Sequence, residues 1–459
     1  MKQWFWLLLC LFLGACTTGE STTSTPIAQG TTLTLSATPS LTPTTEPVNP
    51  DTPTTIAATA TITPTHTPEP TQTPEPISPP TGRIYFMWDP LSRPDDLPDP
   101  VHNLYMAVPG ETPDDWRVEA VLTSLVGIPV IALSPDKTKL AFTALEDANG
   151  DGSVSFQGAA HYLDIPNVFV YSLTNNELER ITDNYPWARN LTWSNDSQRL
   201  AYQSGTDVYI ATHPITGEPE LLHSFPGEVQ ELAWSPDGNY LAVGIYGGEI
   251  YLLDTITSSI TMLDIEKQAS NLTWSPDSQY LVSNEYIGVG LYALDMASLS
   301  TINLVGSDFF SVPLWSPNSP YLAFTEGFRV GIGLPLSSSL TLWDTESGES
   351  HPLTEAYSNL YALWLPDGQN IVLGFLHEEH GQLMVLDITN NTPTILLDIP
   401  GSAELRPLAW SPDGQWLVFH SKDSNGSSLS LIHRTGGQVF QLLDTTDTYV
   451  PYGIFWLSN

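Results

Sequence analysis

One twelve-residue pattern recurs along the chain and restricts what it can fold into. The pattern joins an apolar residue, mostly tryptophan, to a Ser-Pro-Asp-Gly-like turn and an apolar run, as in LAWSPDGNYLAV at 232–243. The other copies lie at 131–142, 191–202, 272–283, 313–324, 362–373 and 408–419. Successive copies start 60, 41, 40, 41, 49 and 46 residues apart. Self-similarity at this spacing indicates a repeat architecture in which each unit packs on its neighbours.

The pattern itself predicts a β-hairpin. Serine at the first turn position, proline with its fixed φ and glycine at the last position suit a type I turn. The tryptophan ends the strand before the turn and can wedge between units, and the alternating run after the turn forms the next strand. Third strands such as 249–254 and short fourth strands such as 259–263 complete a four-stranded meander. Such a unit is typical of a β-propeller blade.

The two ends of the repeat region predict how the ring closes. Residues 83–88, 103–108 and 117–122 look like the second, third and fourth strands of a unit without a first strand. Residues 452–459 look like an isolated first strand. We therefore predict an all-β fold, an eight-bladed β-propeller of four-stranded antiparallel blades. Pairing of the N- and C-terminal strands in one blade would close it and leave no raw edge. Seven blades is the alternative, if the N-terminal strands pack differently.

The W-S-P-D-G-x-x-L-A-F pattern resembles the WD40-like PD40 repeat of TolB-type β-propellers, here in what looks like a bacterial lipoprotein. Similar repeats occur in the propeller domains of dipeptidyl-peptidase-like enzymes. The resemblance covers roughly residues 83–459 and implies the fold, while it says little about function. The sequence contains no G-x-S-x-G nucleophile elbow, P-loop or dinucleotide fingerprint.

The N-terminal residues predict export and anchoring. Residues 1–15 combine Lys2 with an apolar stretch at 4–13 that is too short to span a bilayer but suits a signal peptide. The following Leu-Gly-Ala-Cys resembles a lipobox, which implies that Cys16 is lipidated and that the protein is extracytoplasmic, anchored to the bacterial cell envelope through lipid only. The alternative is an ordinary signal peptide with a chance cysteine.

Composition separates the mature chain into a stalk and a folded domain. Residues 16–82 are rich in threonine and proline, which predicts a disordered stalk, and 83–459 form the propeller domain. The only cysteines are Cys10 and Cys16, so the domain can have no disulfide or zinc–thiolate site. A net charge of −37 argues against nucleic acid as a partner and leaves cations or a basic protein, although acidity can also serve solubility alone.

One acidic loop predicts a structural calcium site. EDANGDGSVSF at 146–156 matches D-x-[DN]-x-[DN]-G, in which alternate oxygen ligands converge on a hard cation. The EF-hand glutamate position holds Gly158, so the loop is not an EF-hand. The alternative is an unliganded turn. The predicted Ca²⁺ ligands are Asp147, Asn149, Asp151, Ser153 through its carbonyl, and Asp164. The HEEH run at 377–380 has the wrong spacing for a zinc helix and favours a solvated turn.

Long insertions predict where function resides. They fall between the second and third strands, at 89–102, 144–167, 326–339 and 376–381, and so emerge on the face opposite the turns. This arrangement predicts a binding face, with neutral loop drift as the alternative. We expect a monomeric, non-catalytic module that binds a protein or glycan.

Two other functions stay open. One is a propeller enzyme, such as a glycan lyase or hydrolase, with His213, His223, Arg189 and Glu231 at the channel mouth. The other is a TolB-like envelope component that docks partner proteins.

Overall fold

The computed structural model divides the chain into two units, Met1–Pro74 and Glu75–Asn459. It describes residues 78–88, 101–110, 115–126, 130–145, 166–182, 188–214, 217–263, 269–285, 289–308, 313–328, 337–401, 404–423, 426–445 and 451–458. Cys16 and the predicted calcium ligands Asp147, Asn149, Asp151, Ser153 and Asp164 lie outside these residues. Within the described part, no helix has the length and hydropathy needed to cross a membrane.

The described residues form 32 β-strands, which pair antiparallel in groups of four. Each group is a blade, and its strands follow one another from the innermost to the outermost. Blade 1 contains β32 (Tyr452–Leu457), β1 (Arg83–Trp88), β2 (Val101–Pro109) and β3 (Trp116–Val126), and blade 2 contains β4 (Ile131–Leu133), β5 (Lys139–Leu145), β6 (Pro166–Ser172) and β7 (Leu178–Arg180). Blade 3 contains β8 (Ala188–Trp193), β9 (Arg199–Ser204), β10 (Asp207–Thr212) and β11 (Glu220–Ser224), and blade 4 contains β12 (Val229–Trp234), β13 (Tyr240–Ile245), β14 (Ile250–Asp254) and β15 (Ile260–Leu263).

The remaining four blades have the same strand order. Blade 5 contains β16 (Ala269–Trp274), β17 (Tyr280–Glu285), β18 (Val289–Asp295) and β19 (Ser300–Asp308), and blade 6 contains β20 (Leu314–Trp315), β21 (Tyr321–Phe328), β22 (Ser337–Asp344) and β23 (Ser350–Pro352). Blade 7 contains β24 (Tyr357–Trp364), β25 (Asn370–His377), β26 (His380–Asp387) and β27 (Thr392–Pro400), and blade 8 contains β28 (Glu404–Trp410), β29 (Trp416–Lys422), β30 (Ser427–His433) and β31 (Val439–Thr445).

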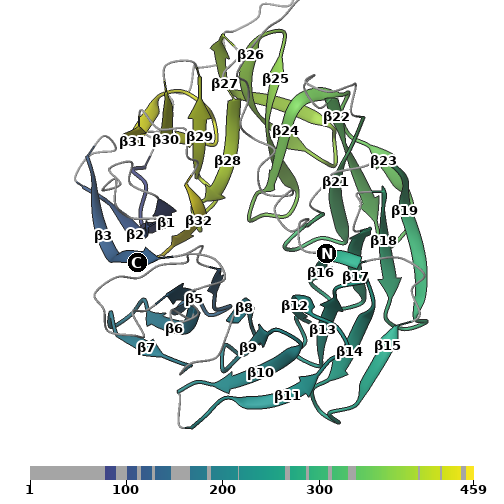
Figure 1. Cartoon of the computed structure of the whole chain (residues 1–459). Coiled ribbons are helices and arrows are strands. Elements are labelled where there is room, and N and C mark those ends of the chain that lie inside the picture. The colour runs from purple at the N-terminus through teal and green to yellow at the C-terminus, as the bar shows by residue number, and fades with distance from the viewer. Residues whose placement is uncertain are drawn as a thin grey trace, which may run out of the picture. The chain divides into compact units, whose positions relative to one another are not determined.

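The blades follow one another around a ring (Figure 1). Short bridges join blade 1 to blade 2 at Val126 and Leu145, and blade 6 to blade 7 through β22 and β24, which gives two eight-stranded sheets. The buried core consists of eight hydrophobic clusters, one in each seam between neighbouring blades. The eight-bladed, four-stranded prediction is therefore confirmed in the described residues.

The first and last described strands meet in blade 1, as predicted for the two ends of the repeat region. Strand β32 pairs antiparallel with β1, with Ile84 opposite Trp456 and Tyr85 opposite Phe455. The Tyr85 and Phe455 rings stack with centroids 5.5 Å apart. Trp456 is 4% exposed and donates from Nε1 to the Thr81 carbonyl at 2.8 Å. The last described strand thus supplies the inner edge of the blade that the first one begins.

The repeated turn is braced by a serine and an aspartate. In blade 4, Ser235 Oγ donates to Asp237 Oδ1 at 2.6 Å and accepts the Tyr240 N–H at 2.9 Å. Gly238 has φ 76°, a conformation that suits glycine. Burial acts to raise the pKa of Asp237, but hydrogen bonds from Ser235 and Asn239 outweigh it and lower the pKa. The same serine–aspartate bond recurs at Ser134–Asp136, Ser194–Asp196, Ser275–Asp277 and Ser411–Asp413.

A tryptophan at the end of the innermost strand packs into the seam with the preceding blade in seven of the eight described blades. Trp193, Trp274 and Trp364 donate from Nε1 to carbonyls of the preceding blade at 2.9–3.1 Å. Seven blades carry such a tryptophan, at Trp193, Trp234, Trp274, Trp315, Trp364, Trp410 and Trp456. Blade 2 has Leu133 there instead. An indole fills a seam and uses its N–H where a backbone acceptor is in reach.

The blade connections define two faces of the ring. Links between first and second strands, and between third and fourth strands, lie on what we call the turn face. Links between second and third strands lie on the opposite insertion face. Residues 89–100, 146–165 and 329–336 make such links and lie outside the described residues. The prediction of an insertion at 376–381 is wrong, because β25 and β26 continue to a two-residue turn at Glu378 and Glu379, both with positive φ.

We predict that Trp456→Ala lowers the free energy of unfolding by about 3–5 kcal/mol, because it empties a buried site in the closing strand. Chemical denaturation of the purified chain measures the change. Ile256→Ala is the control, since this side chain is 77% exposed, and it should change stability by less than about 0.5 kcal/mol. Equal effects of the two substitutions would contradict closure through β32.

Candidate functional site

Charged side chains gather where the innermost strand of blade 8 begins, on the insertion face. Leu405 is 1% exposed and belongs to the core cluster of the seam with blade 7. Of its two neighbours, Glu404 is half-buried and Arg406 is exposed. Because side chains alternate along a strand, Glu404 and Arg406 lie on the same side of β28 as each other. The alternation along β28 thus buries Leu405 in the seam and leaves the Glu404 carboxylate and the Arg406 guanidinium available for other contacts.

Tyr361 of blade 7 links these two charges. Its hydroxyl donates to Glu404 Oε1 at 2.5 Å, and the Arg406 guanidinium carbon lies 5.3 Å from the centre of its ring. Burial raises the pKa of Tyr361, and the hydrogen bond and charge of Glu404 raise it further, against the smaller effect of Arg406. The phenol therefore stays protonated and serves as a donor and an aromatic surface, not as a base.

The second strand of blade 8 adds two basic side chains. Lys422 lies opposite Glu404 and His420 lies opposite Arg406 in the β28–β29 register. His420 is 2% exposed, and its Nε2 has no hydrogen-bond partner in the described part of the chain. Burial lowers the pKa of His420 to about 4, with help from Arg406 and Lys422 and against Glu404. His420 is therefore neutral near pH 7. We call Tyr361, Glu404, Arg406, His420 and Lys422 the polar rim.

The HEEH run lies on the same face, at the β25–β26 turn. His380 Nδ1 is 2.6 Å from Asp398 Oδ1, and Gln382 donates to the other oxygen of that carboxylate at 2.8 Å. The His377 and Tyr357 rings pack edge to face, with their centroids 5.8 Å apart. The run is thus a tight hairpin turn, as favoured over a zinc helix. Among the described residues, no three histidine, cysteine or acidic side chains are grouped to hold a metal.

The four residues expected at the channel mouth do not come together. Arg189 and Glu231 lie on the innermost strands β8 and β12, and Glu231 accepts the N–H groups of Asn271 and Leu272, both at 2.6 Å. His223 lies on the outermost strand β11, so its prediction is wrong. His213 follows the third strand β10 and lies 3.5 Å from Glu179, so its prediction is wrong as well.

The polar rim was missed in the sequence. The available signal was the run ELRPLAW at 404–410, in which two opposite charges alternate with apolar residues at the start of an innermost strand. Its partner Tyr361 lies 43 residues away, in a different blade. Which residue of blade 7 meets this strand depends on the packing of the seam, which the repeat spacing does not determine.

We predict that His420 makes the protein less stable as the pH falls from about 6.5 to about 4. The folded-state pKa is about 4 and the ordinary value is 6.5, so the unfolded chain binds the extra proton throughout this range. The loss amounts to at most about 3 kcal/mol. Urea unfolding measures the free energy of unfolding at pH 7 and at pH 4.5. The difference between the two values should be smaller for His420→Gln than for the native chain. His223→Gln, on the exposed outer strand, should keep the native difference; if His420→Gln also keeps it, the assignment fails.

Comparisons with known proteins agree with the fold. The family of the anaphase-promoting complex subunit 4 WD40 domain matches residues 223–277, which include β12–β15 and the start of blade 5. No curated protein matches the chain.

A search of solved structures gives matches of low sequence identity, of which three are reported. Dihydro-heme d1 dehydrogenase NirN in complex with DHE is 13% identical over 81% of this chain and 74% of that chain, with a TM-score of 0.51. TolB from Acinetobacter baumannii is 14% identical over 67% of this chain and 78% of that chain, with a TM-score of 0.35. Dipeptidyl peptidase 4 from Porphyromonas gingivalis is 11% identical over 56% of this chain and 47% of that chain, with a TM-score of 0.44. The chain therefore has a β-propeller fold, with a short segment similar to a WD40 domain.

Proposed function

We propose that this propeller is a non-catalytic binding module that holds a protein ligand on its insertion face. A lipid on Cys16 would anchor it to the cell envelope, and the stalk at 16–82 would hold the ring away from the membrane. Proteins with this fold perform unrelated tasks, so the proposal rests on the site and not on the architecture.

The polar rim is the observation that carries the proposal. It offers an exposed guanidinium, a carboxylate and an aromatic side chain on the innermost strands of two neighbouring blades, β24 and β28. Tyrosine and arginine are the residue types that most often anchor protein interfaces. The groups are poorly suited to proton transfer, because Tyr361 keeps its proton and His420 is buried. The rim therefore supports recognition over catalysis.

The overall charge favours a basic protein as the ligand. With 51 acidic and 14 basic side chains, the surface attracts positively charged partners and speeds their encounter. Arg406 would then pair with an acidic or carbonyl group of the ligand, while Glu404 receives its donors. A glycan is the second candidate, since an aromatic ring beside a carboxylate also suits a sugar, and the experiment below separates the two.

We predict that a ligand captured from cell-envelope extracts depends on the polar rim. The immobilised full chain is compared with Arg406→Ala and Tyr361→Phe, and with the turn-face control Lys137→Gln. Arg406→Ala should weaken binding at least about tenfold, and Lys137→Gln should leave it unchanged. Protease treatment of the extract should remove the ligand, whereas survival after protease and loss after periodate would identify a glycan. Equal binding by all four proteins would refute a rim site.

A structural calcium ion is proposed for the loop between β5 and β6. Asp147, Asn149 and Asp151 would supply side-chain oxygens, Ser153 its carbonyl, and Asp164 a closing carboxylate. The ion would tie down the long link between β5 and β6.

We predict that chelation lowers the thermal midpoint of the native chain, because an ion bound only to the folded state stabilises it. The midpoint should rise again with added Ca²⁺, and terbium luminescence should report the site directly. Asp151→Ala should abolish both responses, and Glu379→Gln, in a turn on the same face, should keep them. An unchanged midpoint with chelator and no terbium signal would rule the site out.

A further inference from the structure

The seam between blades 1 and 2 lacks the aromatic wedge of the other seams. Six of the seven wedge tryptophans are 4–8% exposed, namely Trp193, Trp234, Trp274, Trp364, Trp410 and Trp456. At this seam the corresponding residue is Leu133, which is half-buried against the cluster that contains Tyr85 and Tyr171. A leucine fills much less space than an indole, and closely packed interiors leave little room for such a difference.

The same seam contains a basic side chain at a position that contacts a tryptophan in two other seams. In blades 2 and 3, the first residue of the second strand is basic and lies on the wedge tryptophan of the next blade. Lys139 Nζ is 5.8 Å from the Trp193 ring, and the Arg199 guanidinium carbon is 4.7 Å from the Trp234 ring. Arg83 is the first residue of β1, the equivalent strand of blade 1. It therefore occupies the cation position of a cation–aromatic pair whose ring is absent.

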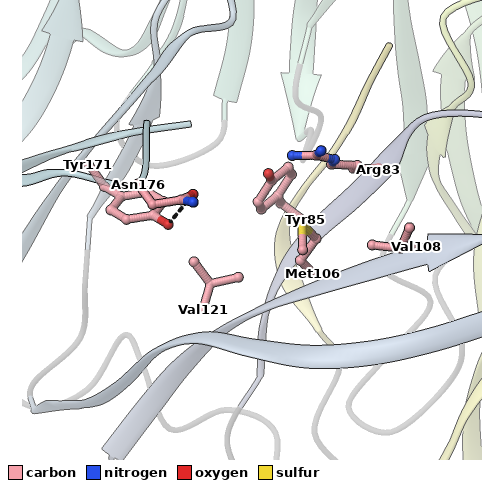
Figure 2. Close-up of a pocket in the computed structure, with 7 residues that line it drawn as sticks. All are labelled: Arg83, Tyr85, Met106, Val108, Val121, Tyr171 and Asn176. Carbon is pink, nitrogen blue, oxygen red and sulfur yellow. Dashed lines mark hydrogen bonds between the residues drawn. The ribbon is translucent and has the colours of Figure 1, made fainter. Parts of the chain in front are cut away.

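A pocket of about 380 Å³ occupies this seam, at the turn face. Figure 2 shows its lining side chains, which come from both blades: Arg83, Tyr85, Met106, Val108, Val121, Tyr171 and Asn176. Tyr171 takes part of the space, since it stands where blade 3 has Ala211 in the strand register. The remaining volume is at the lower end of the range for small-molecule sites.

The pocket is apolar inside and has few polar groups. Tyr85 and Tyr171 are 3% and 5% exposed, and the Tyr171 hydroxyl donates to Asn176 Oδ1 at 2.9 Å. Burial raises the pKa of Tyr171, with a smaller contribution from Tyr85, so this phenol stays neutral. Arg83 and Asn176 are exposed and mark the mouth. No described carboxylate pairs with Arg83, although the chain has 51 acidic residues.

We propose that this pocket binds a planar aromatic molecule that carries a carboxylate. The ring lies between the tyrosines and Val121, in the one described seam that has no wedge tryptophan. The carboxylate lies at the mouth and pairs with the Arg83 guanidinium, which suits a planar anion. The site lies on the turn face, away from the polar rim, so it is independent of the function proposed above.

Calorimetric titration of the full chain tests the ligand class. Indole-3-acetate is the probe, tryptamine presents the same ring with a positive charge, and acetate presents the charge without the ring. Indole-3-acetate should bind with a dissociation constant on the order of 0.1 mM, as expected for a small ligand, and the other two at least about tenfold more weakly. No saturation by indole-3-acetate at 100-fold that concentration, about 10 mM, overturns the proposal, and so does equal binding of tryptamine.

Variants of the seam test the location. Leu133→Trp restores the wedge, so it should abolish indole-3-acetate binding and raise the thermal midpoint. If that chain fails to fold, Val121→Phe fills the pocket from blade 1 and should also abolish binding. Arg83→Gln keeps the volume and should weaken binding about tenfold, while Arg434→Gln, in blade 8, should leave it unchanged. Native affinity in a folded Leu133→Trp or Val121→Phe chain refutes the site.

Discussion

The pairing of β32 with β1 is the constraint on which the rest of the ring depends. A linear array of blades would expose the inner edge of β1 and one unpacked face at each end, and both favour aggregation. Closure gives every blade two neighbours, so that all eight core clusters are buried in seams. Trp456 contributes to the cluster between blades 8 and 1, which shows that the last strand completes the packing as well as the hydrogen bonding.

Within this frame, most of the fold could be predicted from local chemistry. The turn pattern requires a particular backbone, and Ser235, Asp237 and Gly238 each have a role in it that their residue type explains. The hairpins, the wedge tryptophans and the closure followed from repeating that chemistry at a fixed spacing. The misplaced insertion at 376–381 shows the limit, because alternation there is weak and two glutamates adopt the positive φ of a tight turn.

The candidate sites were much less predictable, since they arise from contacts between blades. Tyr361 and Glu404 meet only because the seam brings their strands together, and no spacing rule places a residue of one blade against a chosen residue of the next. His213 and His223 were misplaced for the related reason that the strand count within a blade decides whether a residue faces the axis or the outside. The missing tryptophan of blade 2 was visible in the repeat, but its meaning required the position of Arg83 across the seam.

The order in which the strands are made has a consequence for biogenesis. Arg83 pairs with Leu457, so the two strands of one hydrogen-bonded pair are separated by nearly the whole domain. While the chain is being synthesised, β1 has no partner on its inner side until β32, Tyr452–Leu457, has been made. Contacts this distant in sequence form slowly because the intervening chain must first be ordered. The β1–β32 pair therefore cannot form until β32 is present, and a chain that lacks β32 exposes an unsatisfied strand edge on β1.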